Sequence, residues 1–345
     1  QSSQATYDEW THRWQQNKHN APIAMVLFYR SHLQSGNTAM FDALINGLEK
    51  QGLNPLPVAI SSLKNPESLV LVNELLEKSN ASIILNTTGF TCNTASNAAL
   101  ASQPTDYRSP FVLNVPVLQL ILASSNESYW QSYSQGLSSR DLAMQVVLPE
   151  MDGRVITRAI SFKSEAYYSQ RSQMSVVRYV LHAERAQFVV TLAKNYCALG
   201  RKENKDKRIA LILANYPTKD GRIGNGVGLD TPASTVNILN AMQQVGYPLQ
   251  DVPSDGNALI EALLESVTNN PNTLHQLPCW QSLDVDEYQC FFNDLPQQTQ
   301  HAVLARWGAP DKDPKYRDHR LMIAGIRLGE TFVGIQPARG FNLDL

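Results

Sequence analysis

Apolar stretches alternate with amphipathic segments along the first half of the chain. Residues 23–29 form a continuous apolar run of strand length, which is typical of a strand covered on both faces. Asn37 and Thr38 can cap an amphipathic segment that continues to Glu49, and this pattern predicts a helix. Similar patterns predict strands near 57–60, 82–86 and 116–120 and a helix over 66–78. Strands separated by helices of this length favour right-handed crossovers and a parallel sheet.

The second half repeats this organisation after a charged turn at 201–208. Before the turn, the pattern predicts a strand at 143–148, a short strand at 159–162 and one long helix over 176–199. After it, the pattern predicts strands at 209–213 and 331–335, with helices over 232–245 and 257–267. The expected fold class is therefore α/β, with two Rossmann-like or flavodoxin-like parallel-sheet domains in tandem, joined by a helical connection.

Four segments follow from these patterns. We expect a lead-in helix at 1–20, a first α/β domain at 21–153, a connecting strand and long helix at 154–206, and a second α/β domain at 207–345. The chain starts without Met and stops soon after a strand-like stretch, so we expect a piece of a longer protein in which the second domain is truncated at its C-terminal side.

Composition narrows the class of protein. The 345 residues carry a net charge of −2 and are 17% charged, which favours neither nucleic acid nor an anionic membrane as partner. The longest apolar run, 115–123, is interrupted by Gln119 and is too short to span a bilayer. The cysteines form no C-x-x-C pair, which argues against a structural zinc site and favours a reducing, cytoplasmic location. They are Cys92, Cys197, Cys279 and Cys290.

The first motif with candidate chemistry is Leu148-Pro149-Glu150-Met151-Asp152-Gly153. Because a strand is expected just before it, Glu150 and Asp152 should project near the carboxyl end of that strand, where open α/β sheets bind ligands. Two carboxylates in a partly dry cleft would have a raised pKa, and they could accept protons and touch a divalent cation. A polar turn whose carboxylates face water explains the same residues, and this alternative stays open.

The second motif is a glycine-rich loop that follows the strand at 209–213. Its glycines are Gly221, Gly224, Gly226 and Gly228. The loop only loosely resembles a dinucleotide fingerprint, because it is too long and lacks a suitably placed acidic residue. Its amides, the start of the next helix, Lys219 and Arg222 could instead bind carboxylates. A flexible surface loop is the alternative.

A third group follows the first strand. Arg30 could pair with an anion, and His32 could act as a base or a transient metal ligand, although lone histidines are more often structural. The remaining histidines show no H-x-x-x-H or H-E-x-x-H spacing, so a fixed metal is not expected. The sequence contains neither a G-x-x-x-x-G-K-[ST] loop for ATP hydrolysis nor a G-x-S-x-G elbow.

Six segments together resemble one family, the large subunits of tetrapyrrole metal chelatases. The resemblance covers nearly the whole chain from Ala21 on and includes the Leu148–Gly153 box. Gly224-Asn225-Gly226-Val227-Gly228-Leu229-Asp230-Thr231-Pro232-Ala233-Ser234 looks like the cobaltochelatase (CobN-type) branch rather than the magnesium chelatase H branch. The segments are 22–37, 59–64, 84–90, 138–153 with 159–163 after it, 215–234 and 333–340.

The resemblance implies a function and its partners. Enzymes of this type insert Co²⁺ into hydrogenobyrinic acid a,c-diamide, on the way to cobalamin. The large subunit binds the tetrapyrrole and the metal, while an AAA+ ATPase and its adaptor subunit hydrolyse ATP. No tightly bound cofactor is expected, and Co²⁺ is a substrate.

The resemblance also suggests a role for each candidate residue. Glu150 would line the tetrapyrrole cavity as a proton acceptor and transient metal ligand, with Asp152 as its helper and His32 as a weaker candidate. The substrate-binding candidates are Arg30, Lys219, Arg222, Gly224, Gly226 and Gly228.

Three alternatives remain from the sequence alone. The chain could belong to the magnesium branch, whose H subunit inserts Mg²⁺ into protoporphyrin IX. It could be a non-catalytic docking module for the AAA+ motor, or a periplasmic-type or dinucleotide binder built on Rossmann layers. Because intact large subunits are several times longer than this chain, we expect the isolated piece to be inactive.

Overall fold

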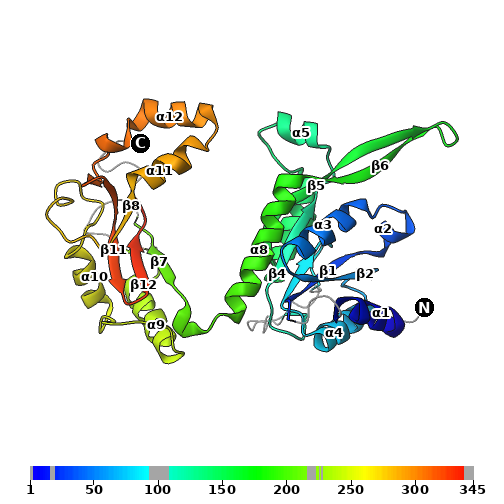
Figure 1. The fold of residues 1–345 in the computed structure, drawn as a ribbon, viewed down its shortest axis with the longest axis horizontal. Coiled ribbons are helices and arrows are strands. Elements are labelled where there is room, and N and C mark those ends of the chain that lie inside the picture. Colours follow the sequence, from blue (N-terminus) through cyan, green and yellow to red (C-terminus); the bar gives the residue numbers. More distant parts are fainter. Residues whose placement is uncertain are drawn as a thin grey trace. The chain divides into compact units, whose positions relative to one another are not determined.

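The computed structural model describes residues 3–15, 20–92, 109–215, 223–224, 226 and 228–337. The chain divides into two compact units, Gln1–Arg201 and Lys202–Leu345 (Figure 1). Each unit combines helices with a sheet that contains parallel strands, so the expected α/β class is confirmed. No helix in the described ranges combines the length and the apolar character needed to cross a bilayer.

A six-stranded sheet forms the centre of the first unit. Its order is β2-β1-β3-β4-β5-β6, and the first five strands run parallel while β6 is antiparallel to β5. Because β1 pairs with both β2 and β3, the order reverses direction beside β1. The strands are β1 (Ile23–Tyr29), β2 (Asn54–Ile60), β3 (Ile83–Asn86), β4 (Val117–Leu122), β5 (Val155–Ser169) and β6 (Met174–Leu181).

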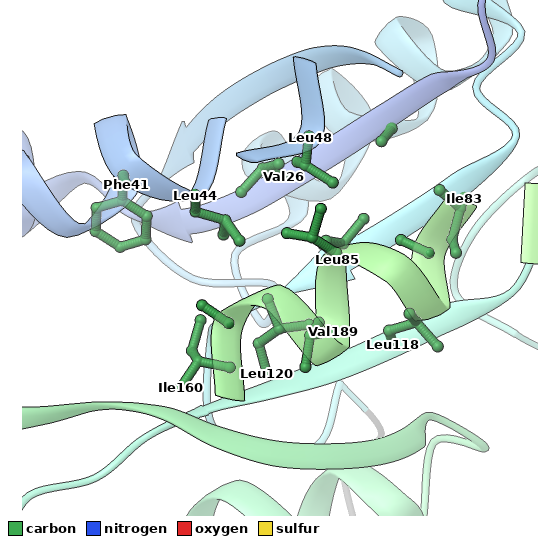
Figure 2. Close-up of a cluster of buried hydrophobic side chains, with 14 of the residues drawn as sticks. Val26, Phe41, Leu44, Leu48, Ile83, Leu85, Leu118, Leu120, Ile160 and Val189 are labelled. Carbon is green, nitrogen blue, oxygen red and sulfur yellow. The ribbon is translucent and has the colours of Figure 1, made fainter. Parts of the chain in front are cut away.

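Helices cover both faces of this sheet. Helices α3 (Ala39–Lys50) and α8 (Ala183–Arg201) pack on one face, where their apolar side chains meet those of β1, β3 and β4 (Figure 2). Helix α4 (Pro66–Ser79) packs on the other face, and α1 (Ser3–Gln15) adds Trp10, whose indole N–H donates to the Pro55 carbonyl oxygen at 2.8 Å. Coverage on both faces explains why the strands read as continuous apolar runs.

Two secondary-structure predictions in this unit are wrong. Residues 143–148 form helical turns instead of a strand. The helix predicted over 176–199 begins later, at the first residue of α8, and the residues before it belong to strand β6. Residues 174–181 pair with the long strand β5 in a hairpin. Their apolar pattern, rich in valine, is compatible with a strand or a helix, and the pairing with β5 selects the strand. Within the segment 154–206, β5, β6 and α8 thereby join the first unit.

The described residues of the second unit form two three-stranded sheets. Strands β7 (Ile209–Leu213) and β12 (Thr331–Ile335) are parallel neighbours, and β11 (Gly325–Leu328) pairs antiparallel with the other side of β12. Helices α9 (Thr231–Gln244) and α10 (Gly256–Leu264) pack with this sheet around a second core. These two helices and strands β7 and β12 confirm the sequence pattern. The other sheet consists of β8 (Gln281–Asp284), β10 (Arg320–Ile323) and β9 (Tyr316–Arg317), with α11 (Val285–Asn293) and α12 (Gln297–Trp307) beside it in sequence.

Candidate functional site

The motif that contains Glu150 lies on a crossover helix. Helix α6 (Ser139–Leu142), the π-helical turn Ala143–Val147 and helix α7 (Leu148–Glu150) follow one another without a break. In a parallel sheet this connection must return the chain from the end of β4 to the start of β5, so Glu150 precedes a strand instead of following one. The expected position of Glu150 at the carboxyl end of a strand is therefore wrong. Single π-helical turns occur frequently at functional sites.

The crossover helix is held to the end of β4 by two buried or half-buried side chains. The amide of Gln145 accepts from the backbone N–H of Leu122 at 2.8 Å and donates to its carbonyl oxygen at 2.7 Å. The buried carboxylate of Asp141 accepts from the N–H and the hydroxyl of Ser124 at 2.9 and 2.8 Å. These bonds fix the backbone that carries Glu150 to the sheet.

The side chain of Glu150 is exposed. Two apolar neighbours on the same helical stretch are exposed as well, Val147 at 53% and Met151 at 44%. The partly dry cleft that the sequence led us to expect is not formed around this carboxylate by the described residues. A dry environment at Glu150 requires a substrate or another part of the protein to cover it.

Asp152, by contrast, is buried in an ion pair. Its Oδ2 lies 2.7 Å from Nη2 of Arg154, and both side chains are only 1% exposed. The same oxygen accepts from the backbone N–H of Cys92 at 2.8 Å, and Oδ1 accepts from the hydroxyl of Thr91. Asp152 therefore anchors the segment that follows β3, and its role as a helper of Glu150 stays a prediction.

Arg154 is the centre of a buried polar network. Its Nη1 donates to Oε1 of Gln119 at 3.0 Å and to the carbonyl oxygen of Thr88 at 3.3 Å. Its Nη2 donates to the carbonyl oxygen of Phe90 at 3.2 Å and to Sγ of Cys92 at 3.3 Å, in addition to the bond with Asp152. One guanidinium group thus ties β4, the start of β5 and the segment after β3 together.

Two buried amides complete the network. Nδ2 of Asn86 donates to Oε1 of Gln119 at 2.7 Å, and both side chains donate to the carbonyl oxygen of Thr88. Sequence reasoning missed Arg154, Asn86 and Gln119. For Asn86 and Gln119, the available signal was a polar residue inside an otherwise apolar strand. A polar residue there is expected to be buried and to need hydrogen-bond partners, and both side chains are fully buried.

Burial also sets the protonation of two groups beside Arg154. It raises the pKa of the Cys92 thiol to about 11, against the opposing effect of the Arg154 charge. Burial likewise raises the pKa of Tyr29, whose hydroxyl donates to the carbonyl oxygen of Gly89 at 3.3 Å. Cys92 is therefore a neutral thiol at neutral pH, which is unsuited to hold a divalent metal as a thiolate.

The candidates after β1 differ in their surroundings. Arg30 begins helix α2 (Arg30–Gln34) and is exposed. His32 is 9% exposed, and its ring packs edge-on against Phe41 and Tyr179 at centroid distances of 5.0 and 5.5 Å. Burial lowers the pKa of His32, so the neutral ring is favoured in the folded protein. The structure places His32 among aromatic side chains of α3 and β6.

This environment predicts a pH effect on stability. Because the pKa of His32 is lower in the folded than in the unfolded chain, the unfolded state binds the extra proton first as the pH falls. The contribution of the neutral ring to the free energy of unfolding is complete above the unfolded pKa of about 6.5. It is lost as the pH falls through the pKa of the folded state. Urea unfolding between pH 8 and 5 should show a smaller loss of stability in His32→Phe than in the wild type. Equal losses in both proteins would contradict this assignment.

The glycine-rich loop belongs to the second unit. Gly221, Lys219 and Arg222 lie outside the described residues. The carbonyl oxygen of Gly226 accepts from the N–H of Leu229 at 3.2 Å, which closes a tight turn before α9. Gly224 and Gly228 adopt positive φ angles of 69° and 74°, a conformation that favours glycine.

The start of α9 already has an acidic partner. The Asp230 carboxylate accepts from the N–H of Ala233 at 3.0 Å, and Pro232 lies in the first turn. An acidic cap satisfies one of the free N–H groups that would otherwise bind a carboxylate ligand. The binding roles predicted for Lys219, Arg222, Gly224, Gly226 and Gly228 therefore stay predictions.

Among the described residues of the second unit, one group of side chains consists of residue types that can bind metals. Oxygen or nitrogen atoms of Asp284, Asp286 and His319 lie within 4.8 Å of one another. Asp284 already accepts from the N–H of Asp286 at 2.9 Å and pairs with Arg320 at 3.3 Å. Asp286 in turn lies 3.2 Å from Nε2 of His319, so all three side chains have polar partners within the protein.

Comparison with known proteins shows to which family the chain belongs. The model of the CobN/Magnesium Chelatase family matches residues 1–345. The chain belongs to this family. The resemblance expected from the motifs is thereby confirmed over the entire chain, including the box around Glu150 and the glycine-rich loop.

Similar proteins come from both branches of the family. The chain is 50% identical over 342 residues to the aerobic cobaltochelatase subunit CobN of Pseudomonas aeruginosa, covering 99% of this chain and 26% of that protein. It is 26% identical over 333 residues to the magnesium-chelatase subunit ChlH of Oryza sativa subsp. indica, covering 94% and 22%. The solved catalytic subunit of cobaltochelatase from Mycobacterium tuberculosis matches with a TM-score of 0.71 and 33% identity, covering 93% and 26%. The chain thus spans about a quarter of the length of these relatives.

Proposed function

We propose that this chain is part of the tetrapyrrole-binding large subunit of an ATP-dependent cobaltochelatase. In this role it helps to insert Co²⁺ into hydrogenobyrinic acid a,c-diamide during cobalamin biosynthesis, in the cytoplasm. The observation that carries the proposal is the 50% identity to a CobN subunit across nearly the whole chain, against 26% to a magnesium-chelatase H subunit. The enzyme would be a multi-subunit chelatase of the ligase type, and the isolated piece would be inactive.

The first unit supplies the chemistry in this proposal. Insertion requires two pyrrole N–H protons to leave while the metal exchanges water for nitrogen ligands. The exposed carboxylate of Glu150, on a helix fixed by Gln145 and Asp141, can accept a proton and touch the incoming Co²⁺. Asp152 and Arg154 support it by holding the following turn to the sheet. The strand order β2-β1-β3-β4-β5 supports a flavodoxin-like layer as the framework.

The remaining roles fall to residues of both units and to partner subunits. Lys219 and Arg222, with the backbone of Gly224, Gly226 and Gly228, would steer the carboxylate arms of the tetrapyrrole. Arg30 and His32 are weaker candidates in the first unit. An AAA+ ATPase and its adaptor subunit would hydrolyse ATP, which agrees with the lack of a P-loop motif in these 345 residues, and the proposal includes no tightly bound cofactor.

Substrate preference tests this proposal directly. The intact large subunit is titrated with hydrogenobyrinic acid a,c-diamide and with protoporphyrin IX, and binding is followed by fluorescence quenching. We expect the corrin precursor to bind at least about tenfold more tightly, which corresponds to 1.4 kcal/mol. Co²⁺ insertion should then require ATP and both partner subunits.

Each other outcome points to a specific alternative. Tighter binding of protoporphyrin IX would favour the magnesium branch. Binding of neither tetrapyrrole, together with capture of the AAA+ motor, would favour a docking module. The β5–β6 hairpin, which exposes Tyr167, Tyr168 and Met174, is the feature that such a module would use.

A further inference from the structure

The strand order of the first unit reverses direction between β1 and β3. Because β1 pairs with β2 on one side and β3 on the other, the connections leave β1 and β3 in opposite directions. Open α/β sheets bind ligands in the crevice outside the carboxyl ends of strands at such a point. Tyr29 ends β1, and its hydroxyl donates across this point to Gly89, directly before Phe90 in the segment that follows β3.

Phe90 has an unusual backbone conformation at this position. Its φ angle is +66°, in the left-handed region that bulky side chains rarely adopt. Both backbone groups are held, because its N–H donates to Met144 at 2.8 Å and its carbonyl oxygen accepts from Arg154 at 3.2 Å. Such strain persists only when the surroundings impose it, and it is concentrated at ligand-binding sites.

The clamped backbone leaves the ring in solvent. Phe90 is 45% exposed, and the ammonium group of Lys64 lies 5.5 Å from the ring centroid. An aromatic face beside a cation can bind a flat conjugated molecule that carries carboxylate arms.

The backbone of Phe90 is bonded to the helical stretch that carries Glu150. Met144, which accepts the N–H of Phe90, lies six residues before Glu150 on the crossover helix. Exposed Val147 lies between them, and exposed Met151 follows. Even at the α-helical rise of 1.5 Å per residue, the backbone from Met144 to Glu150 spans only about 9 Å, a distance that one macrocycle can bridge.

We infer that the Phe90 ring is a stacking surface for the tetrapyrrole macrocycle and that Lys64 pairs with one of its carboxylate arms. This inference rests on the proposed function and adds a binding residue to it. The macrocycle would cover Val147 and extend toward Glu150, which would provide the dry environment that the described residues do not supply around this carboxylate.

A substitution at Phe90 can test this without damaging the fold. In the intact subunit, Phe90→Gly removes the ring and places at this position the residue that adopts a positive φ most readily. We expect the Kd for hydrogenobyrinic acid a,c-diamide, measured by fluorescence quenching, to rise about tenfold. The rate of Co²⁺ insertion at saturating tetrapyrrole should change less than about twofold, because a ring that binds substrate and transition state alike affects KM and not kcat.

Phe188 offers a matched control. This residue is 41% exposed and its ring also lies beside a cation, with the Arg158 guanidinium 3.6 Å from the centroid, but it belongs to α8. Phe188→Leu should leave the Kd unchanged, whereas Phe90→Leu should raise it several-fold. Lys64→Gln should weaken binding about threefold and reduce its dependence on salt.

The outcomes separate this inference from the proposed function. Wild-type affinity in Phe90→Gly and Phe90→Leu would overturn the stacking role and leave the cobaltochelatase proposal intact. An equal loss in Phe188→Leu would also overturn it, because the effect would not be specific to this position. A wild-type subunit that binds no tetrapyrrole would overturn the proposed function, and this inference with it.

Discussion

Replacing Glu150 by Gln in the intact subunit should lower the rate of Co²⁺ insertion by about 10²-fold or more. A positioned proton acceptor contributes about 10²–10⁴-fold to a rate, and an amide of nearly the same shape cannot take a pyrrole proton. The side chain is exposed and its backbone is held by other residues, so the fold should not change. The Kd for the tetrapyrrole should stay within about twofold of the wild type, because a carboxylate that acts in the transition state need not contribute to ground-state binding.

The measurement is ATP-driven insertion with both partner subunits, followed by the absorbance change of the macrocycle. Glu74→Gln is the matched control, because Glu74 is an exposed acid on α4. It should insert Co²⁺ at the wild-type rate. Wild-type insertion by Glu150→Gln would refute the role proposed for Glu150, and the family assignment would stand.

Replacing Arg154 by Met should destabilise the first unit by about 3–5 kcal/mol. This is the usual cost of removing one partner of a buried ion pair, because the remaining charge is left without compensation. Here the Asp152 carboxylate, at 1% exposure, would lose its cationic partner. The carbonyl oxygens of Thr88 and Phe90 would each lose a charged donor as well.

Urea unfolding followed by circular dichroism measures the loss, and a second substitution tests its cause. Adding Asp152→Asn to Arg154→Met removes the uncompensated charge. The amide oxygen can still accept from the N–H of Cys92, and the amide NH2 can donate to the hydroxyl oxygen of Thr91, so about half of the loss should be recovered. Lys205→Met, which breaks an exposed ion pair with Glu203, should cost less than about 1 kcal/mol. A loss at Arg154 as small as the loss at Lys205 would show that the network does not stabilise the fold.

Local patterns were sufficient for the elements whose signals are contained in a few neighbouring residues. Strand β1 is a continuous apolar run, and α4 begins at Asn65 and Pro66, whose cap and fixed φ angle act within one turn. The hairpin β5–β6 was missed in part because its partner strand, and not its own periodicity, determines its conformation. The strand predicted at 143–148 is wrong because the periodicity of so short a mainly apolar segment does not distinguish a strand from a helix.

The amino-acid sequence by itself determined the α/β class, most of the strands and the family, since these depend on apolar periodicity and on motifs that are contiguous along the chain. Only the tertiary structure decided the surroundings of the candidate residues. It left Glu150 exposed, buried Asp152 against Arg154, packed His32 among aromatic rings and held Phe90 at a positive φ. Burial and pairing are created by residues far apart in the sequence, such as Gln119 and Arg154, and no local pattern encodes which distant side chains will meet.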